Sequence, residues 1–325
     1  MDTSYIYLLL LLSTLTLTIF ITKKIIPKLS QIAKQPIYED GPKWHLRKSG
    51  TPTMGGIGFI IPICIVLTVT ATALARGNNN QSVSLILAIT FSILNSLIGV
   101  IDDITKLKKS TNGGLTPLQK IFFQLIVSIL FLVSRRYFLG DDTSIYFGTY
   151  QIDLGILYYP LSIIFLLGII NCANLTDGID GLATSVAFAI AVCSFLLSFH
   201  NNVTVWTMSI AIVGATIGFL LFNIHPAKIF MGDTGSLFLG AIVASIAFSM
   251  RSLPAYLLIC IVYVIEGFSV IIQVLYFKKT GKRILKMAPI HHHLEKIGFD
   301  ENKICIIAMI ITFIMSLFAF PLIRG

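Results

Sequence analysis

Ten long apolar runs divide this chain, and no other feature of the sequence restricts its fold as strongly. They cover about residues 5–22, 56–75, 83–101, 118–134, 155–172, 182–199, 204–222, 235–250, 254–277 and 304–323. A transmembrane helix needs about 20 mainly apolar residues, and the runs approach that length. The sequence therefore predicts an all-α integral membrane protein with about ten transmembrane helices. A separate soluble domain would not fit in 325 residues, so we expect residues 1–325 to form a single polytopic membrane domain.

The charged residues support this class of protein and predict its orientation. Only 12% of the residues are charged, against about 25% in an ordinary soluble domain, which argues against a soluble enzyme. The net charge of +9 would suggest a nucleic-acid partner in a soluble protein, but nineteen of the 24 basic residues lie in or beside alternate loops. By the positive-inside rule, those loops are cytosolic, both termini are periplasmic and no nucleic-acid partner is expected. The cytosolic loops are 23–55, 102–117, 173–181, 223–234 and 278–303.

One outer loop differs from the helical pattern. Residues 145–152 form two short runs rich in β-favouring side chains on either side of Gly148. This pattern predicts a small periplasmic β-hairpin.

Unusual polar residues gather on the predicted cytosolic side. Asp102 and Asp103 end one apolar run, Asp177 and Asp180 lie between two others, and Asp233 precedes another. An Asp at mid-bilayer costs about 2.5–3.5 kcal/mol, so five of them at the ends of spans indicate a charged ligand or a metal ion. For the Asp102–Asp103 pair alone, a solvated helix end is an equally good explanation.

The other polar segments have chemistry that suits phosphates and a hard cation. The segment 171–182 combines two Asp-Gly turns with the amides of Asn171 and Asn174, a set that suits Mg²⁺ and hydrogen bonding to a sugar or base. Asp233 precedes a helix start, which attracts phosphate or supports a metal ligand, although simple capping is the alternative. Three consecutive histidines, 291–293, do not share a helical face, so we expect contacts to phosphate or a carboxylate instead of zinc ligation.

These residues together indicate phosphoryl transfer at the inner leaflet. The chain shows carboxylates for a divalent metal, cationic loops and phosphate-friendly helix starts, without a hydrolase nucleophile signature. One substrate would be an anionic, nucleotide-activated cytosolic compound, and the other a lipid phosphate.

Five short segments of the chain resemble those of a known enzyme family. They are Gly50–Gly56, Asp102–Asp103, Asn174–Leu182, Phe230–Leu237 and Met287–Glu295, in this order along the chain. They are similar to the polyprenyl-phosphate N-acetylhexosamine-1-phosphate transferases, and in particular to the phospho-N-acetylmuramoyl-pentapeptide transferases. The resemblance implies Mg²⁺-dependent transfer of phospho-MurNAc-pentapeptide from UDP-MurNAc-pentapeptide to undecaprenyl phosphate, giving UMP and lipid I in the first membrane step of peptidoglycan synthesis. It also implies a homodimer in the bacterial inner membrane.

The resemblance also implies roles for individual residues. Asp233 is the expected Mg²⁺ ligand with Asp102 and Asp103 beside it, and Asp102 would deprotonate or position the lipid phosphate. The implied catalytic residues are Asp102, Asp103, Asp233, His292 and His293. The implied substrate-binding residues are Lys48, Thr53, Lys120, Asn174, Asp177, Gly178, Asp180, Asn223, Phe230 and Gln273, where Phe230 would stack on uracil.

Three questions stay open at this point. A phosphate nucleophile is already charged at neutral pH, which favours direct attack, but a covalent aspartyl-phosphate intermediate is the competing mechanism. A sister transferase that uses a UDP-N-acetylhexosamine without peptide is the nearest alternative enzyme. A transporter is the alternative from another class, because Glu266 and Gln273 could line a pathway through the membrane. Glu266 could equally make a hydrogen bond within a bent helix.

Overall fold

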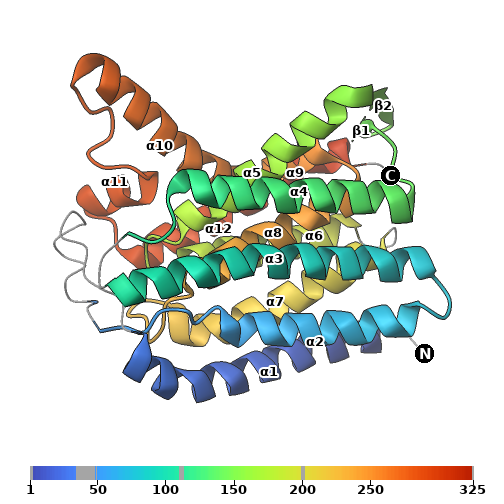
Figure 1. Ribbon diagram of the computed structural model, residues 1–325, viewed down its shortest axis with the longest axis horizontal. Coiled ribbons are helices and arrows are strands. Elements are labelled where there is room, and N and C mark those ends of the chain that lie inside the picture. Colours follow the sequence, from blue (N-terminus) through green and yellow to red (C-terminus); the bar gives the residue numbers. More distant parts are fainter. Residues whose placement is uncertain (1–2, 34–47, 49, 110–112, 199–201, 324–325) are drawn as a thin grey trace.

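The computed structural model describes residues 3–33, 48, 50–109, 113–198 and 202–323. The part of the cytosolic loop prediction that concerns residues 34–47 lies outside the described residues. Helices dominate the described chain (Figure 1). They are α1 (Thr3–Ile32), α2 (Ile57–Leu74), α3 (Asn79–Lys109), α4 (Pro117–Leu139), α5 (Tyr158–Thr176), α6 (Leu182–Ser198), α7 (Val203–Asn223), α8 (Gly232–Met250), α9 (Leu253–Ile259), α10 (Ile261–Thr280), α11 (Ile290–Lys296) and α12 (Glu301–Ala319), with short 3₁₀ turns η2 (Gly155–Leu157) and η3 (Phe320–Leu322).

Nine helices within the described ranges are long and apolar enough to cross a membrane. They are α1–α5, α7, α8, α10 and α12, two of them extended by a neighbouring 3₁₀ turn. The remaining apolar run forms α6, a helix of 17 residues that lies at the short end of the usual range for a span. The prediction of an all-helical membrane protein is confirmed.

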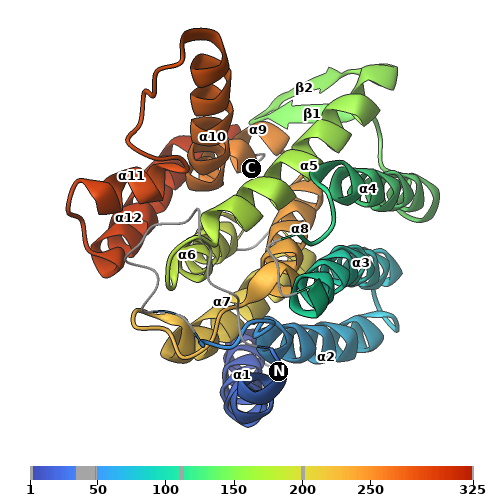
Figure 2. The same ribbon diagram turned by 60° about the vertical axis from the view of Figure 1, so that its left-hand side comes forward.

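Helix α8 lies at the centre of the bundle and is enclosed by α3, α5, α6 and α7 (Figure 2). Every residue from Thr234 to Met250 is buried, although the helix is only moderately apolar. Small residues let neighbouring backbones approach α8, because a side chain on Gly240 would press on Ile170 of α5. The central helix therefore meets protein instead of lipid on all sides, and its first turn is held in a fixed place.

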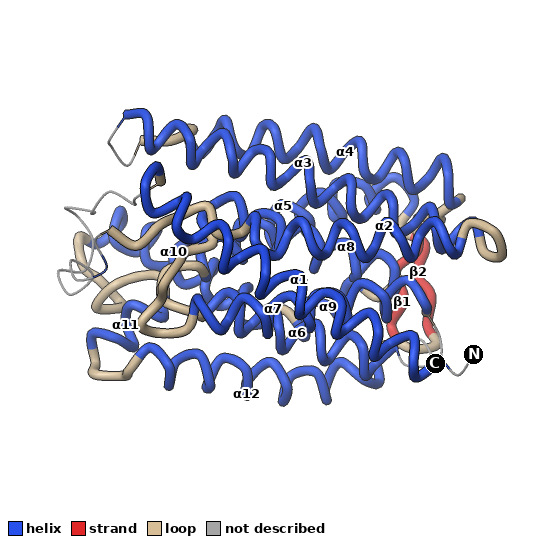
Figure 3. The backbone as a smooth tube through the Cα atoms, turned by 90° about the horizontal axis from the view of Figure 1, so that it is seen from below, coloured by secondary structure: helices blue, strands red, loops and turns tan. Residues whose placement is uncertain are grey.

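The two ends of the bundle differ. The chain termini and a two-stranded sheet lie at one end, and α11 lies at the other (Figures 1 and 3). Strands β1 (Ser144–Phe147) and β2 (Tyr150–Asp153) pair antiparallel, with Ile145 opposite Ile152. A β-hairpin near 145–152 is thus confirmed, with Gly148 at a positive φ of 59° in its turn.

Three helices depart clearly from their predicted limits. Helix α1 continues about ten residues beyond the predicted end of its run, to Ile32. The run 254–277 was expected to form one helix, but the chain bends at the buried Cys260, which separates α9 from α10. The bend lets α9 pack on α12 and β1 while α10 packs on α5 (Figure 2), so tertiary contacts decide here against a continuous helix. Helix α3 continues about two turns beyond the predicted end of its run, to Lys109. Asp102 and Asp103 therefore lie within a helix.

Candidate active site

Three aspartates from two helices meet at the end of the bundle that carries α11. Asp102 and Asp103 come from the last turns of α3, and Asp233 comes from the first turn of α8. Carboxylate oxygens of all three lie within 4.8 Å of one another. Asp102 is 0% exposed and Asp103 is 4% exposed, so their charges need compensation from neighbouring groups.

Two lysines provide that compensation. Lys106, one turn after Asp102 on α3, places its Nζ 2.6 Å from Asp102 Oδ2 and 3.2 Å from Asp233 Oδ2. Lys120, in the first turn of α4, places its Nζ 3.0 Å and 2.5 Å from the same two oxygens. Both ammonium groups thus bridge Asp102 and Asp233. We call these five residues (Asp102, Asp103, Lys106, Lys120 and Asp233) the acidic centre.

Asp103 is engaged differently from its two neighbours. Its Oδ2 accepts hydrogen bonds from the backbone N–H of Thr234 at 2.9 Å and from the Thr234 hydroxyl at 2.7 Å. Its Oδ1 accepts from the backbone N–H of Asp233 at 3.2 Å. Asp103 therefore satisfies free N–H groups at the start of α8 and ties α8 to α3. Gly232, at φ 69°, permits this close approach, because a Cβ there would lie 2.6 Å from Asp103 Oδ2.

Two further predicted residues border the acidic centre. The Nδ2 of Asn174, at the end of α5, donates to Asp233 Oδ1 at 3.0 Å and to Ser236 Oγ at 2.7 Å. Thr53 is buried beside Gly232, since a Cβ on Gly232 would lie 2.8 Å from Thr53 Oγ1. Asn174 thus orients Asp233 from the side opposite the lysines.

Lys48 and Asp180 belong to a second charged cluster. Lys48 Nζ lies 2.7 Å from Asp180 Oδ1 and 2.7 Å from Glu301 Oε2. Asp180 Oδ2 lies 3.0 Å from His225 Nδ1 and accepts the backbone N–H of Ala227 at 3.0 Å. The cluster joins the chain before α2, the turn after α5, the loop before α8 and the start of α12. It holds together four segments at the same end of the molecule.

The turn Asp177–Gly178 is influenced by the charges of both clusters. Burial, followed by the negative charges of Asp233, Asp103 and Asp180, raises the pKa of Asp177 well above its usual range, and Lys48 opposes the shift. A methyl group on Gly178 would overlap Nε2 of His291, so the backbone here lies directly against that imidazole.

The remaining predicted residues contact groups other than the acidic centre. Asn223 donates to the Ile229 carbonyl at 3.0 Å and accepts from the Thr184 hydroxyl at 2.7 Å, which shapes the loop before α8. Gln273 Oε1 accepts the backbone N–H groups of Ile284 and Leu285 at 3.1 and 3.0 Å, which holds the chain after α10.

Phe230 and the histidines of α11 complete the predicted set. Phe230 is half-buried, and its backbone pairs with Pro52 and Gly55. His292 Nδ1 lies 2.6 Å from Glu295 Oε2, and His293 Nδ1 accepts the backbone N–H of Lys286 at 3.2 Å.

Four residues of these clusters were absent from the predicted site. Lys106 could have been found, because it follows Asp102 by four positions on a helix. His225 and Glu301 gave no comparable signal, since each reaches its partner across the fold. His291 belongs to the histidine run 291–293, and the contact to a carboxylate expected for that run is present between His291 and Glu266.

The donor set of the acidic centre fits a Mg²⁺ ion. Three carboxylates bring oxygen atoms, the ligands that Mg²⁺ prefers, within 4.8 Å of one another. Asp102 and Asp233 are the stronger candidates, because both oxygens of Asp103 accept hydrogen bonds from the start of α8. Lys106 and Lys120 balance the same two carboxylates in this structure.

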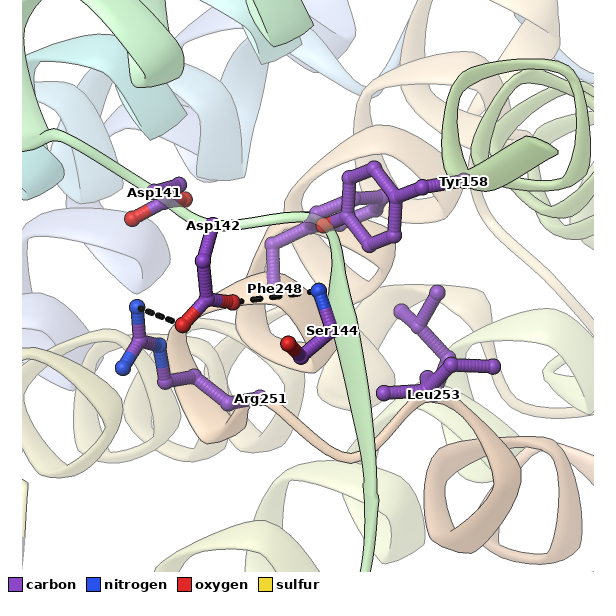
Figure 4. Close-up of a pocket in the computed structure, with 8 residues that line it drawn as sticks. Asp141, Asp142, Ser144, Tyr158, Phe248, Arg251 and Leu253 are labelled. Atoms are coloured by element: carbon purple, nitrogen blue, oxygen red, sulfur yellow. Dashed lines mark hydrogen bonds and ion pairs between the residues drawn. The ribbon is translucent and has the colours of Figure 1, made fainter. Parts of the chain in front are cut away.

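A pocket at the hairpin end of the bundle contains none of the predicted residues (Figure 4). Asp142 Oδ2 lies 3.7 Å from Arg251 Nη2, and Asp142 Oδ1 accepts the backbone N–H of Ser144 at 3.1 Å. The pocket adjoins the last residues of α8, about 27 Å from Asp233 at 1.5 Å per residue. It therefore belongs to a different region of the molecule from the acidic centre.

The membrane helix bundle and its acidic centre belong to a known class of transferases, as a comparison with protein families shows. Residues 84–251 match the model of glycosyl transferase family 4, a segment that contains the acidic centre and the turn after α5.

Curated relatives define the family more narrowly. The phospho-N-acetylmuramoyl-pentapeptide-transferase of Clostridium perfringens (strain SM101 / Type A) is 40% identical over 298 residues, which cover 91% of this chain and 90% of the relative. The enzyme of that name from Clostridium botulinum (strain Eklund 17B / Type B) is 43% identical over 88% of this chain and 86% of its own. The enzyme of that name from Halalkalibacterium halodurans is 40% identical over 93% of this chain and 92% of the relative.

The chain belongs to the phospho-N-acetylmuramoyl-pentapeptide-transferase family. It is therefore an enzyme, and the nine long apolar helices in the described part of the chain indicate a multi-pass protein of the bacterial plasma (inner) membrane.

Proposed function

We propose that this enzyme transfers phospho-MurNAc-pentapeptide from UDP-MurNAc-pentapeptide to undecaprenyl phosphate, which yields lipid I and UMP. One observation carries the proposal: two carboxylates, the buried Asp102 and the half-buried Asp233, are bridged by two lysines at the end of a membrane helix bundle. Such a centre can bring a lipid phosphate and a nucleotide diphosphate together despite their like charges. The names of the relatives specify the phospho-N-acetylmuramoyl-pentapeptide group.

Phosphoryl transfer assigns distinct tasks to these residues. An oxygen of the lipid phosphate attacks the phosphorus attached to the sugar, and the bond to the bridging oxygen breaks, so that UMP leaves with that oxygen. Lys106 and Lys120 would stabilise charge that grows on the leaving phosphate. Asp233 and Asp102, with Asp103 beside them, would hold Mg²⁺, which supplies neutralising charge and orientation. Asp102 would also position the acceptor, and His292 and His293 would assist at the catalytic centre.

The remaining predicted residues would bind the donor. Asp177 and Gly178 lie on the turn after α5, and Asn174 lies in the last turn of that helix. The Lys48–Asp180 pair holds the turn to the start of α12. Phe230, on the loop before α8, would stack on uracil. The proposed donor-binding set is Lys48, Thr53, Lys120, Asn174, Asp177, Gly178, Asp180, Asn223, Phe230 and Gln273.

We further propose that the acidic centre faces the cytosol and that both termini are periplasmic. The excess of nineteen basic residues over five supports this orientation, and the termini lie at the hairpin end of the bundle (Figure 3). The proposal includes ten spans, with α6 as the tenth, one membrane domain over residues 1–325, and a homodimer.

A choice of donors tests the proposed function. Purified protein in detergent with Mg²⁺ and undecaprenyl phosphate should release UMP from UDP-MurNAc-pentapeptide. Release from UDP-GlcNAc should be slower by about 10²-fold or more, because a site built for the pentapeptide donor loses binding contacts with the smaller sugar. The measurement is coupled detection of UMP with each donor at equal concentration. Faster release from UDP-GlcNAc would identify the sister transferase, and no release from either donor would favour a carrier.

An exchange experiment tests direct attack. Because the attacking phosphate is largely dianionic at neutral pH, positioning suffices and no protein nucleophile is required. Enzyme freed of lipid should therefore not incorporate labelled UMP into UDP-MurNAc-pentapeptide, while added undecaprenyl phosphate should permit incorporation. Rapid exchange without lipid phosphate would show a covalent aspartyl-phosphate intermediate instead.

A further inference from the structure

Glu266 places a carboxylate inside membrane-spanning helix α10, away from the acidic centre. Its side chain is buried, with a residue exposure of 3%. A carboxylate inside a span is costly unless a specific partner compensates it. That partner is His291, whose Nδ1 lies 2.9 Å from Glu266 Oε2, and whose backbone N–H also points to this oxygen at 3.5 Å. Glu266 therefore holds the first turn of α11.

The imidazole of His291 connects this carboxylate to the donor-binding turn. His291 is 0% exposed, and its second nitrogen, Nε2, is buried without a hydrogen-bond partner among the described residues. A methyl group on Gly178 would overlap Nε2 and lie 2.7 Å from Cε1, so only a glycine leaves room for the ring. The His291 ring thus contacts Glu266 of α10 through one nitrogen and packs against the Asp177–Gly178 turn with the other.

The Glu266 contact also determines what Nε2 can do. An ionised Glu266 can only accept hydrogen bonds, so Nδ1 must carry the proton between them. Nε2 is then left for another group. A buried polar atom without a partner costs free energy, and such an atom beside a ligand-binding turn indicates a contact that the ligand completes.

We propose that Glu266 is a positioning residue of the transfer reaction, acting through His291 on the Asp177–Gly178 turn and keeping Nε2 ready for a hydrogen bond with the bound nucleotide-sugar donor. This inference rests on the proposed function and extends it to a carboxylate outside the acidic centre. If Glu266 had a merely structural role, it would do no more than anchor α11, a seven-residue helix that is too short to be stable alone. A positioning role predicts a lower kcat/KM for the nucleotide-sugar donor with an unchanged KM for undecaprenyl phosphate. A merely structural role predicts equal effects on both substrates.

Variants of the Glu266–His291 pair separate these roles. Glu266→Ala should lower kcat/KM for UDP-MurNAc-pentapeptide by about 10²-fold, as the loss of a residue that orients a functional histidine does elsewhere. Glu266→Gln keeps an oxygen that accepts from Nδ1, so it should recover to within about 10-fold of the wild type. His291→Phe keeps a ring but removes both nitrogens, and it should match Glu266→Ala. The double variant should be no worse than His291→Phe alone.

The matched control is Ser269→Ala, which lies one turn after Glu266 on α10. Its hydroxyl donates to the carbonyl of Glu266 at 2.6 Å, and its loss should leave kcat/KM within about two-fold. KM for undecaprenyl phosphate and the thermal unfolding midpoint, measured in the same detergent, should stay constant across the whole set.

Several results would overturn the proposal. They are wild-type activity of Glu266→Ala, additive losses in the double variant, a Gln variant as poor as the Ala variant, or equal effects on both substrates. If Glu266→Ala does not fold, Glu266→Gln and His291→Phe still distinguish the two roles. If the wild type prefers UDP-GlcNAc, the proposed function fails, and the same variants test Glu266 with that donor. If it releases UMP from neither donor, both proposals fail.

Discussion

Replacing Asp233 with Asn is expected to abolish Mg²⁺-dependent turnover, with a fall in kcat of about 10³-fold or more. Asp233 is the residue at which the acidic centre converges, because Lys106, Lys120 and Asn174 all contact its carboxylate. The substitution keeps the size of the side chain but removes its charge and one oxygen. A cation that needs carboxylate oxygens would bind more weakly, and two lysines would lose their shared partner.

The measurement is UMP release from UDP-MurNAc-pentapeptide over a range of Mg²⁺ concentrations, with thermal unfolding as the check on folding. Asp300→Asn is the matched control, since Asp300 is another aspartate at a helix start, that of α12, and is exposed. Asn serves as well as Asp at a helix N-cap, so this variant should keep full activity. Near-normal turnover by Asp233→Asn at low Mg²⁺ would refute the metal assignment.

The positions of the long apolar helices were the part of the fold most open to prediction. Within the described residues, nine of the expected runs form helices long and apolar enough to cross a membrane. The length of a span depends on bilayer thickness, which acts on each run separately. The hairpin was predictable for a similar local reason, as a glycine stands between two β-favouring runs. The bend at Cys260 was not, because it follows from the different partners of α9 and α10.

The candidate site likewise has features that depend on local sequence and features that depend on tertiary packing. Aspartates next to apolar runs draw attention by their cost, and Asp102, Asp103 and Asp233 do meet in space. Their separate tasks could not be read from the sequence. Asp103 accepts the free N–H groups at the start of α8, and this becomes visible only when α3 and α8 lie side by side.

Glu266 shows the limit of sequence reasoning most directly. An acid in an apolar run was compatible with a pathway through the membrane or with a bent helix. Its partner, His291, is 25 positions away on another helix. Only the packing of α11 against α10 brings them together.

Replacing Lys120 with Gln is expected to lower kcat by about 10²-fold, the effect of losing one charged group that stabilises a transition state. Lys120 stands at the start of α4, where a capping box formed by Thr116 and Gln119 fixes the first turn. This places its Nζ 2.5 Å from Asp233 and 3.0 Å from Asp102. Lys120→Arg keeps the charge but presents a planar fork, so it should restore only part of the rate.

Lys108→Gln is the matched control, because Lys108 is exposed and loses the same charge outside the acidic centre. The Mg²⁺ dependence then separates Lys120 from Asp233. Removing an ammonium group leaves Asp102 and Asp233 more negative, so Lys120→Gln should need no more Mg²⁺ than the wild type for half-maximal rate, whereas Asp233→Asn should need more. A raised Mg²⁺ requirement in Lys120→Gln would mean that the lysine organises the metal-binding carboxylates. An unchanged kcat would exclude it from the transfer step.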